Sequence, residues 1–395
     1  MMDASNRSSS RSNVAPFYVM EVLAAAQERN RTHGDALFLC AGQPATGAPR
    51  EVLATAKQQL DASVLGYTEA VGTPELRETI AAYHRAQYGT DTVADDVVIT
   101  TGSSGGFVSL FLAALDVGDD IVLARPGYPA YRNTLEALGA NVIEIDCGAE
   151  SRFQLTVAHL AALPRVPKAV IVTSPDNPTG TIIDPEELEA IARWCSDNDC
   201  LLISDEIYHG ISYGRRCASA REFSKDAVVV GSVSKYFSMT GWRIGWLIIP
   251  QWLRAPLDRL SANLTVCPPA VSQAAAVAAF SEASLAELNS HVERYARNRE
   301  ILIEGLPTAG LGQIAPPDGG FYIYANIASL YDDPSKADSM TWARELLDAT
   351  GVAVAPGIDF DTKAGREWVR LCFAGSSEDM EEAVKRIGHF TGYSH

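Results

Sequence analysis

Residues 169–210 have the sequence AVIVTSPDNPTGTIIDPEELEAIARWCSDNDCLLISDEIYHG, and the class of the fold follows from them. The two ends of this stretch, Ala169–Thr173 and Leu201–Ser204, are short and largely apolar. This is the pattern of strands that are buried on both faces of a sheet. A helix is expected to begin at Asp184, because this N-cap aspartate is followed by a proline and, three residues after the cap, by Glu187. A strand, a helix and a strand of these lengths predict two parallel strands with a crossover helix.

The same alternation of short apolar runs and helices extends to both sides of this stretch. Most of the runs are continuous rather than alternating, so we expect a mostly parallel sheet with helices on both faces. The further strands are expected at Val97–Thr101, Ile121–Ala124, Asn141–Ile145, Ala227–Val230 and Ile244–Ile249.

The last third of the chain has a different pattern. One long helix rich in Ala, Glu and Arg is expected from Ala270 to Leu306, and the strands beyond it are widely spaced. An apolar helix near Phe17–Ala26 precedes the sheet, so we expect it to pack on this C-terminal part. The late strands are expected at Phe321–Ala325, Val352–Ala355 and Val369–Phe373. The expected division is a polar tail at 1–14, an N-terminal segment at 15–48 that packs on the small domain, a large domain at 49–285 and a small α+β domain at 286–395.

Composition excludes several classes of protein. Hydrophobic residues make up 47% of the 395 residues, which is enough for a sizeable core. The 49 acidic and 32 basic residues give a net charge of −17, which disfavours binding to nucleic acid or anionic membranes. No run approaches the roughly 18 apolar residues of a membrane span. The first residues lack the apolar segment of a secretory signal.

The cysteines indicate a reducing environment. They are odd in number and lack CxxC spacing, which disfavours a disulfide framework or a metal site, so we expect no metal and a cytoplasmic location. They lie at Cys40, Cys147, Cys195, Cys200, Cys217, Cys267 and Cys372.

A second informative stretch, residues 227–246, is AVVVGSVSKYFSMTGWRIGW and places Lys235 directly after an apolar strand. A lysine there is also compatible with a head group that reaches solvent, because an ammonium is costly to desolvate. A buried amine, however, has a lowered pKa and reacts with aldehydes. Ser232, Ser234 and Arg243 offer hydroxyls and a guanidinium for a phosphate dianion. An amine beside a phosphate site is what pyridoxal phosphate requires when it is held as a Schiff base.

Residues 201–210 carry Asp205 at the carboxyl end of a strand, where ligands of open α/β sheets bind. A simple helix N-cap is the alternative for this aspartate. Beside a pyridine ring, its carboxylate would keep the ring nitrogen protonated, so that the ring accepts electrons when the substrate Cα loses its proton. Tyr208 is expected to hydrogen-bond the phenolic oxygen of the ring. We expect structural roles for Glu206 and His209.

Three more junctions carry candidate residues. In 174-SPDNPTG-180, prolines and a glycine fix a turn in which Asn177 could donate to the cofactor oxygen or to a substrate carboxylate. The segment 100-TTGSSGGF-107 joins a strand to a helix, and its free N–H groups form an anion site. It matches neither the P-loop nor GxGxxG, so a nucleotide is disfavoured. Tyr128 is expected to stack on a flat ring, although such an aromatic residue is also compatible with core packing.

Together these motifs resemble the class I and II aminotransferases of the fold-type I pyridoxal-phosphate enzymes. The resemblance rests on SPDNPTG, SDEIY, SVSKYFSMTGWRIG and the later WVRLCFA, and it covers the chain from about Phe17 onward. It implies an α/β fold with a large domain, built on a mostly parallel sheet flanked by helices, and a smaller α+β domain. It also implies that Lys235 is the Schiff-base lysine, which moves the Cα proton, and that Asp205 is the pyridinium partner.

The resemblance implies roles for the other site residues. Tyr128 matches the stacking aromatic residue, and Arg370 matches the arginine that binds the substrate α-carboxylate. Gly42 matches a loop that closes over this carboxylate, to which Asn177 also contributes. Tyr67 matches a tyrosine that reaches the phosphate of the neighbouring subunit, which implies a homodimer with shared active sites. The residues implied to contact the ring oxygen or the phosphate are Asn177, Tyr208, Ser103, Ser104, Ser232, Ser234 and Arg243.

The implied function is transfer of an amino group from an L-amino acid to a 2-oxo acid by a ping-pong mechanism, with 2-oxoglutarate or pyruvate as the acceptor. The loop 42–49 reads GQPATGAP, where many relatives carry Glu and Asp after the glycine. No arginine stands in 261–269 to bind a second substrate carboxylate. Donors with smaller or apolar side chains are therefore as compatible with the sequence as aspartate, and the donor itself is not identified.

Three alternatives to amino-group transfer differ in what they require of the sequence. A pyridoxal-phosphate lyase that breaks a C–S or Cβ bond, or closes a ring, would have the same cofactor site. A ligand-sensing regulator on this fold needs a basic DNA-binding domain, for which there is no room before Phe17 and which the net charge of −17 disfavours. An NAD enzyme is disfavoured by the missing glycine fingerprint.

Overall fold

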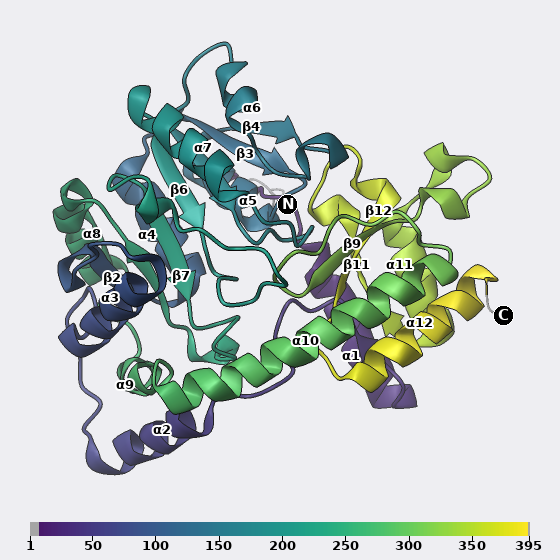
Figure 1. The fold of residues 1–395 in the computed structure, drawn as a ribbon, viewed down its shortest axis with the longest axis horizontal. Coiled ribbons are helices and arrows are strands. Elements are labelled where there is room, and N and C mark those ends of the chain that lie inside the picture. The colour runs from purple at the N-terminus through teal and green to yellow at the C-terminus, as the bar shows by residue number, and fades with distance from the viewer. Residues whose placement is uncertain (1–7, 394–395) are drawn as a thin grey trace, which may run out of the picture.

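A seven-stranded sheet forms the centre of the larger part of the protein in the computed structural model, which describes residues 8–393 (Figure 1). Its strand order is β2-β8-β7-β6-β5-β3-β4. All seven strands predicted from the sequence are confirmed, with ends that differ by at most two residues. The strands are β2 (Val97–Thr100), β3 (Asp120–Arg125), β4 (Asn141–Asp146), β5 (Ala169–Thr173), β6 (Leu201–Asp205), β7 (Val228–Ser232) and β8 (Gly245–Ile248).

The strands from β4 to β7 are parallel, and only β8 pairs in the antiparallel sense, with β2 and β7. The register places Thr173 of β5 opposite Asp205 of β6, and Asp205 opposite Val230 of β7. Because parallel strands end at the same edge of a sheet, the loops that follow these three strands meet there. Three of the motifs singled out in the sequence lie in these loops or directly before them.

Both faces of the sheet are covered by helices, as the apolar runs predict. In β5, Val170 and Val172 belong to one buried cluster, whereas Ala169 and Ile171 belong to the cluster on the other face. Alternate side chains of one strand are therefore buried on opposite faces. The helices of this part are α3 (Pro74–Tyr88), α4 (Gly102–Ala114), α5 (Pro129–Leu138), α6 (Val157–Ala161), α7 (Pro185–Asp197) and α8 (Gln251–Leu264).

Helix α7 begins where the sequence predicts, but its predicted cap is not formed. Asp184 occupies the N-cap position and makes no side-chain cap hydrogen bond. Its carboxylate instead accepts from Arg215 Nη1 at 2.5 Å, and Glu187 accepts from the backbone N–H of Val157 at 2.5 Å. Tertiary partners therefore replace the local cap.

The prediction of one long helix from Ala270 to Leu306 is wrong, although the stretch is helical. It is divided into α9 (Ala270–Ala278) and α10 (Glu282–Thr308). The division lies at Ser281, whose hydroxyl accepts from the N–H of Ser284 at 3.1 Å and so caps the start of α10. Figure 1 shows α10 running from beside α9 to beside α12 (Ser377–Thr391), across both parts of the protein.

The C-terminal part contains a three-stranded antiparallel sheet of order β11-β12-β9. The predicted strand at Val352–Ala355 is in fact two, β10 (Val352–Ala353) and β11 (Ala355–Pro356), which belong to different sheets. The other elements of this part are β9 (Tyr322–Asn326), α11 (Ser339–Thr350) and β12 (Trp368–Cys372).

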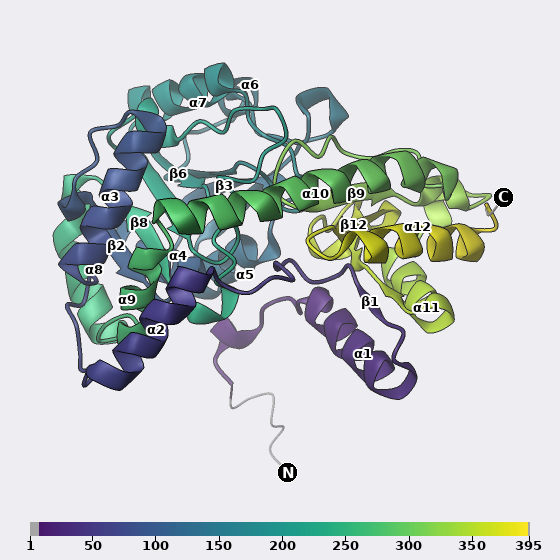
Figure 2. The same ribbon diagram turned by 60° about the horizontal axis from the view of Figure 1, so that its bottom comes forward.

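The N-terminal segment crosses to this C-terminal part (Figure 2). Helix α1 (Tyr18–His33) contacts β10, β11 and α11, and β1 (Leu37–Phe38) pairs in parallel with β10. Helix α2 (Arg50–Ala62) packs instead against α9. Of the predicted polar tail at 1–14, the first seven residues lie outside the described part of the chain. Within residues 8–393, no helix combines the length and the apolar character needed to cross a membrane.

Candidate active site

Lys235 lies three residues after β7, and its amine is held at the edge where the parallel strands end. Its Nζ donates to the carbonyl oxygen of Gly42 at 2.6 Å and lies 5.7 Å from the ring centre of Tyr208. Burial lowers the pKa of this amine to about 8. About a tenth of the amine is therefore unprotonated at pH 7, far more than for a free lysine, and this is the nucleophilic form.

Asp205 is the last residue of β6 and is 1% exposed. One carboxylate oxygen accepts from the N–H of Ile207 at 3.1 Å, and the other accepts from the hydroxyl of Tyr131. Burial raises the pKa of this carboxyl to about 6. Its charged form is costly to bury alone, so it is suited to face a cationic group of a ligand.

Arg370 lies on β12 and is buried, and its hydrogen-bond partners are neutral groups. Its Nη1 donates to Asn177 Oδ1 at 2.8 Å, and its Nη2 donates to the carbonyl of Cys40 at 2.6 Å. Its guanidinium carbon lies 4.4 Å from the ring centre of Tyr322 and 4.8 Å from that of Phe360. Its Nε is buried without a hydrogen-bond partner. This incompletely satisfied fork is suited to bind a carboxylate.

The start of α4 lies against Arg243. Gly102 begins the helix with φ +71°, and a Cβ on it would collide with Arg243 Nη2. Ser103 and Ser104 follow in the first turn, where backbone N–H groups have no partner within the helix. Arg243 is anchored by a hydrogen bond from Nη1 to the carbonyl of Thr240 at 3.0 Å. A helix N-terminus and a guanidinium thus converge, as a phosphate dianion requires.

Ser232, the last residue of β7, and Ser234 precede Lys235 and contact each other. Ser232 Oγ donates at 2.8 Å to Ser234 Oγ and lies 3.1 Å from the carbonyl of Ile244. The N–H of Ser234 donates to Ser232 Oγ at 3.0 Å. The lysine loop and the strand before it are therefore connected by hydroxyl contacts directly before Lys235.

The predicted aromatic residues line the same space. Tyr208 is buried, with its hydroxyl 2.7 Å from that of Tyr322, and burial raises its pKa well above the usual value. Burial also raises the pKa of Tyr128, whose hydroxyl experiences the charges of Asp205, Arg370 and Arg243. Tyr128 therefore lies among the three charged residues of the predicted site.

Gly42 is brought to the site by the chain between β1 and α2. Besides accepting from Lys235, it lies so close to Tyr322 that a Cβ would collide with the tyrosine hydroxyl.

Tyr67 is the exception among the predicted residues, because it is 87% exposed and points to solvent in a single chain. Glu206 binds the N–H of Ala220 and lies in a separate buried network.

Sequence reasoning missed Tyr131 and Tyr322. Tyr131 hydrogen-bonds Asp205 and lies 3.2 Å from Thr173 Oγ1. A signal existed, because Tyr131 stands three residues after Tyr128, the spacing that places two side chains on one face of a helix start. Tyr322 had no such signal.

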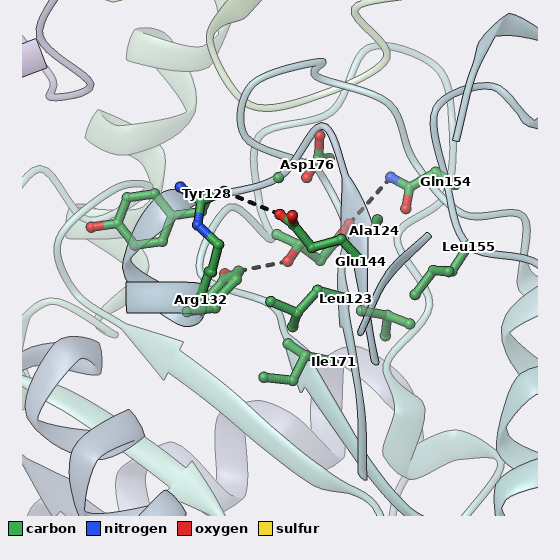
Figure 3. A pocket seen from close by; sticks show the side chains of 13 residues that line it. Leu123, Ala124, Tyr128, Arg132, Glu144, Gln154, Leu155, Ile171 and Asp176 are labelled. Carbon is green, nitrogen blue, oxygen red and sulfur yellow. Dashed lines mark hydrogen bonds and ion pairs between the residues drawn. The ribbon is translucent and has the colours of Figure 1, made fainter. Parts of the chain in front are cut away.

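A small space of about 20 Å³ lies beside Tyr128 (Figure 3), and Tyr131 also lines it. Asp176 and Gln154 also line it, and Arg132 binds Glu144 nearby at 3.1 Å. Burial raises the pKa of Asp176 to about 7. The space holds about one water molecule and is too small for a cofactor.

Comparison with known proteins identifies the family. Residues 35–387 match the family described as aminotransferase class I and II. The chain belongs to this family. It is 51% identical over 380 residues to a valine–pyruvate aminotransferase of Mycobacterium tuberculosis, with 96% of this chain and 97% of the relative covered. It is 34% identical over 382 residues to an aspartate/prephenate aminotransferase of Thermus thermophilus, with 95% and 96% covered.

Solved aminotransferases have the same fold. An aminotransferase from Mycobacterium tuberculosis has a TM-score of 0.95 at 50% identity, with 98% of this chain and 99% of that chain covered. The aspartate aminotransferase of Thermus thermophilus with maleate has a TM-score of 0.90 at 33% identity, with 97% and 99% covered. The predicted α/β fold of fold-type I is therefore confirmed. The chain is a transaminase that acts on amino acids and 2-oxo acids, and the comparisons give no support to a lyase.

Proposed function

We propose that this aminotransferase holds pyridoxal phosphate, the cofactor that its family uses, on the amine of Lys235. The observation that carries the proposal is the convergence at one sheet edge of a partly buried amine with a pKa of about 8, a buried carboxylate at Asp205 and an anion site between α4 and Arg243. These three features match the aldehyde, the ring nitrogen and the phosphate of that cofactor. The close approach of Arg243 to Gly102 supports the proposed phosphate site.

When bound, pyridoxal phosphate would accept the amino group of the donor and withdraw electrons from its Cα. Lys235 would hold the cofactor and then accept and return the Cα proton at Nζ. Its lowered pKa supports this role, because a base is most effective when its pKa lies near the working pH. Asp205 would keep a proton on the ring nitrogen, with Tyr131 orienting its carboxylate.

The remaining groups would bind and orient. Asn177 and Tyr208 would hydrogen-bond the ring oxygen, and Tyr128 would stack on the ring. Arg370 would bind the substrate carboxylate, since its Nε is buried without a partner, and Gly42 would close over that carboxylate. The phosphate would be bound by the amides of Ser103 and Ser104 together with Ser232, Ser234 and Arg243.

We propose amino donors with small apolar side chains and pyruvate as the acceptor. The groups that pack on the guanidinium of Arg370 are the aromatic rings of Tyr322 and Phe360, which suit an apolar side chain. The relative that is 51% identical is named valine–pyruvate aminotransferase. We expect valine and alanine to exceed aspartate in kcat/KM with pyruvate. Higher kcat/KM for aspartate than for both would contradict this choice of donor.

We also propose that the protein works as a homodimer in the cytoplasm. Large hydrophobic residues stand exposed at the end of α2 and in the loop after it, with Val64 99% and Tyr67 87% exposed. A second copy that covers this surface would bring Tyr67 to the neighbouring phosphate. All seven cysteines are free thiols, which agrees with a reducing compartment.

A Lys235→Ala variant tests the proposal. Wild-type protein mixed with pyridoxal phosphate and treated with borohydride should carry the cofactor covalently at residue 235. The variant should carry none there and should lose amino-group transfer. Lys225→Ala is the control, because Lys225 is an exposed lysine paired with Asp91. Trapping at another lysine in wild-type protein would overturn the assignment.

A further inference from the structure

Two cysteines lie together where helix α7 ends. The N–H of Cys200 donates to the carbonyl of Cys195 at 2.9 Å, and the N–H of Asp199 is directed at the carbonyl of Ser196 at 3.5 Å. Asp199 has φ +54°, the left-handed conformation. These are the two hydrogen bonds and the left-handed residue of a Schellman motif, in which the side chains of the first and last residues meet.

In this protein the two side chains that meet are the thiols of Cys195 and Cys200 rather than hydrocarbon side chains. The backbone hydrogen bond from Cys200 to Cys195 brings these two side chains together at the helix end, and both thiols are free. The backbone hydrogen bonds of the helix end fix how far apart the two Cα atoms lie, and the side-chain torsions then set the distance between the sulfurs. Contact between two sulfurs is the first requirement for a disulfide.

A cavity of about 450 Å³ gives small solutes a route to this pair. Both cysteines line it, together with Asp199 at the helix end and Trp252 of α8. Cys195 itself is only 2% exposed and Cys200 is 7% exposed, so access to the sulfurs depends on this cavity. None of the residues that line it belongs to the candidate active site.

We propose that Cys195 and Cys200 form an oxidisable dithiol, which a peroxide converts into an intramolecular disulfide. One thiol loses its proton, and the thiolate attacks a peroxide oxygen. The O–O bond breaks, the leaving hydroxide takes up that proton, and a sulfenic acid and one water result. The second thiol attacks the sulfenic sulfur, the S–S bond forms, and the S–O bond breaks with release of a second water. The two sulfurs together lose two electrons, and hydrogen peroxide is reduced to two waters. A thiol reductant reverses the change.

The surroundings set the rate of this reaction. The neighbouring thiol of Cys200, together with burial, raises the pKa of the Cys195 thiol well above the usual value. Because the thiolate is the attacking form, oxidation is slow at neutral pH and becomes faster as the pH rises. The pair therefore stays reduced in a reducing compartment and reacts when peroxide accumulates.

Other cysteines provide internal comparisons. Cys147 is buried, and its sulfur lies 3.4 Å from the carbonyl of Ile145, a backbone group. Cys40 and Cys372 lie near each other beside Arg370, but they stand on different segments without the helix-end motif. Oxidation confined to residues 195 and 200 is thus a specific expectation.

The test treats the holoenzyme with hydrogen peroxide, blocks the remaining thiols and maps the peptides without reduction. We expect a cross-link between residues 195 and 200, loss of two of the seven thiols, and return of both with dithiothreitol. Oxidation should be faster at pH 9 than at pH 7. Cys195→Ala and Cys200→Ala should each lose the cross-link, whereas Cys147→Ala should keep it.

A second measurement needs no variant, so a substitution that fails to fold does not decide the matter. Phenylarsine oxide binds two neighbouring thiols with loss of one water. It should bind wild-type protein and protect residues 195 and 200 together from alkylation. The proposal is overturned if both thiols remain alkylatable after either reagent, or if peroxide links another pair such as Cys40 and Cys372.

Discussion

At the scale of single residues, burial of Asp205 has a consequence for stability. Its pKa of about 6 in the folded protein lies above its value of about 4 in the unfolded chain. Between these values the folded state binds more protons, so this residue lowers the free energy of unfolding as pH rises from about 4 to 6. Above pH 6 its full cost is present, on the order of 2–3 kcal/mol.

Asp205→Asn should remove this cost in the protein without cofactor. We expect the variant to be more stable than wild type at pH 7.5 by that amount, with no difference below about pH 4, measured by urea unfolding. Asp258→Asn, on the exposed face of α8, should show no such dependence on pH. Asp205→Asn should also bind pyridoxal phosphate more weakly than wild type does. Equal stability of wild type and Asp205→Asn at both pH values would refute the buried charge.

Arg370 should act on substrate binding. Arg370→Ala is expected to raise the KM of the amino donor about a hundredfold or more, because losing a buried charge-assisted fork costs roughly 2–5 kcal/mol. Arg370→Lys keeps the charge without the fork, so its KM should lie between the two. Arg366→Ala is the control, since this nearby arginine is exposed and paired with Asp338. A KM close to that of wild type in Arg370→Ala would remove the arginine from the carboxylate site.

Residues such as Lys235 and Asp205 could be predicted because each stands at or just after a strand whose apolar pattern is visible in the sequence. The edge where parallel strands end then brings them together. Tyr322 could not be predicted, since its contact with Tyr208 joins residues 114 positions apart and depends on how β9 packs. Arg370 was identified only through the family resemblance for the same reason.

At the scale of elements, the start of α4 depends on a glycine. Gly102 combines φ +71° with a Cβ position that Arg243 already occupies. Gly102→Ala should therefore strain the backbone by about 1–2 kcal/mol and also displace the guanidinium from the anion site. We expect weaker binding of pyridoxal phosphate, measured by titration of the protein without cofactor.

Gly118→Ala is a matched control for this prediction. Gly118 has φ +91°, but nothing lies within 4 Å of its Cβ position. This variant should lose similar stability and keep its cofactor affinity. If both variants lowered the affinity equally, backbone strain alone would account for the effect, and Arg243 would have no special part in it.

The elements also show where the sequence is informative. Most strands of the large sheet could be predicted because they are buried on both faces and are therefore largely apolar, whereas the edge strand β4 is only partly buried. The break between α9 and α10 was missed, since helix-forming residues surround Ser281 and only its hydroxyl marks the boundary. The strands β1, β10 and β11 have two residues each, too few for any periodicity to be recognised.

At the scale of the whole molecule, Tyr67 has a possible function only if a second chain covers it. Besides this tyrosine, Val64, Leu264 and Val266 are large hydrophobic residues that stand exposed on a single chain. Burying such a surface favours association. Sedimentation should therefore give about twice the chain mass of 42.4 kDa.

Hybrid dimers distinguish a shared site from a self-contained one. Lys235→Ala alone should be inactive, and Tyr67→Ala alone should bind the cofactor more weakly. If Tyr67 serves the neighbouring site, a hybrid of the two chains places both defects in one site and leaves the other site intact. Mixing the variants should then restore activity with wild-type cofactor affinity, up to about half of the wild-type rate per hybrid. If Tyr67 serves its own chain, every hybrid site carries one defect, and mixing should restore no site with wild-type affinity.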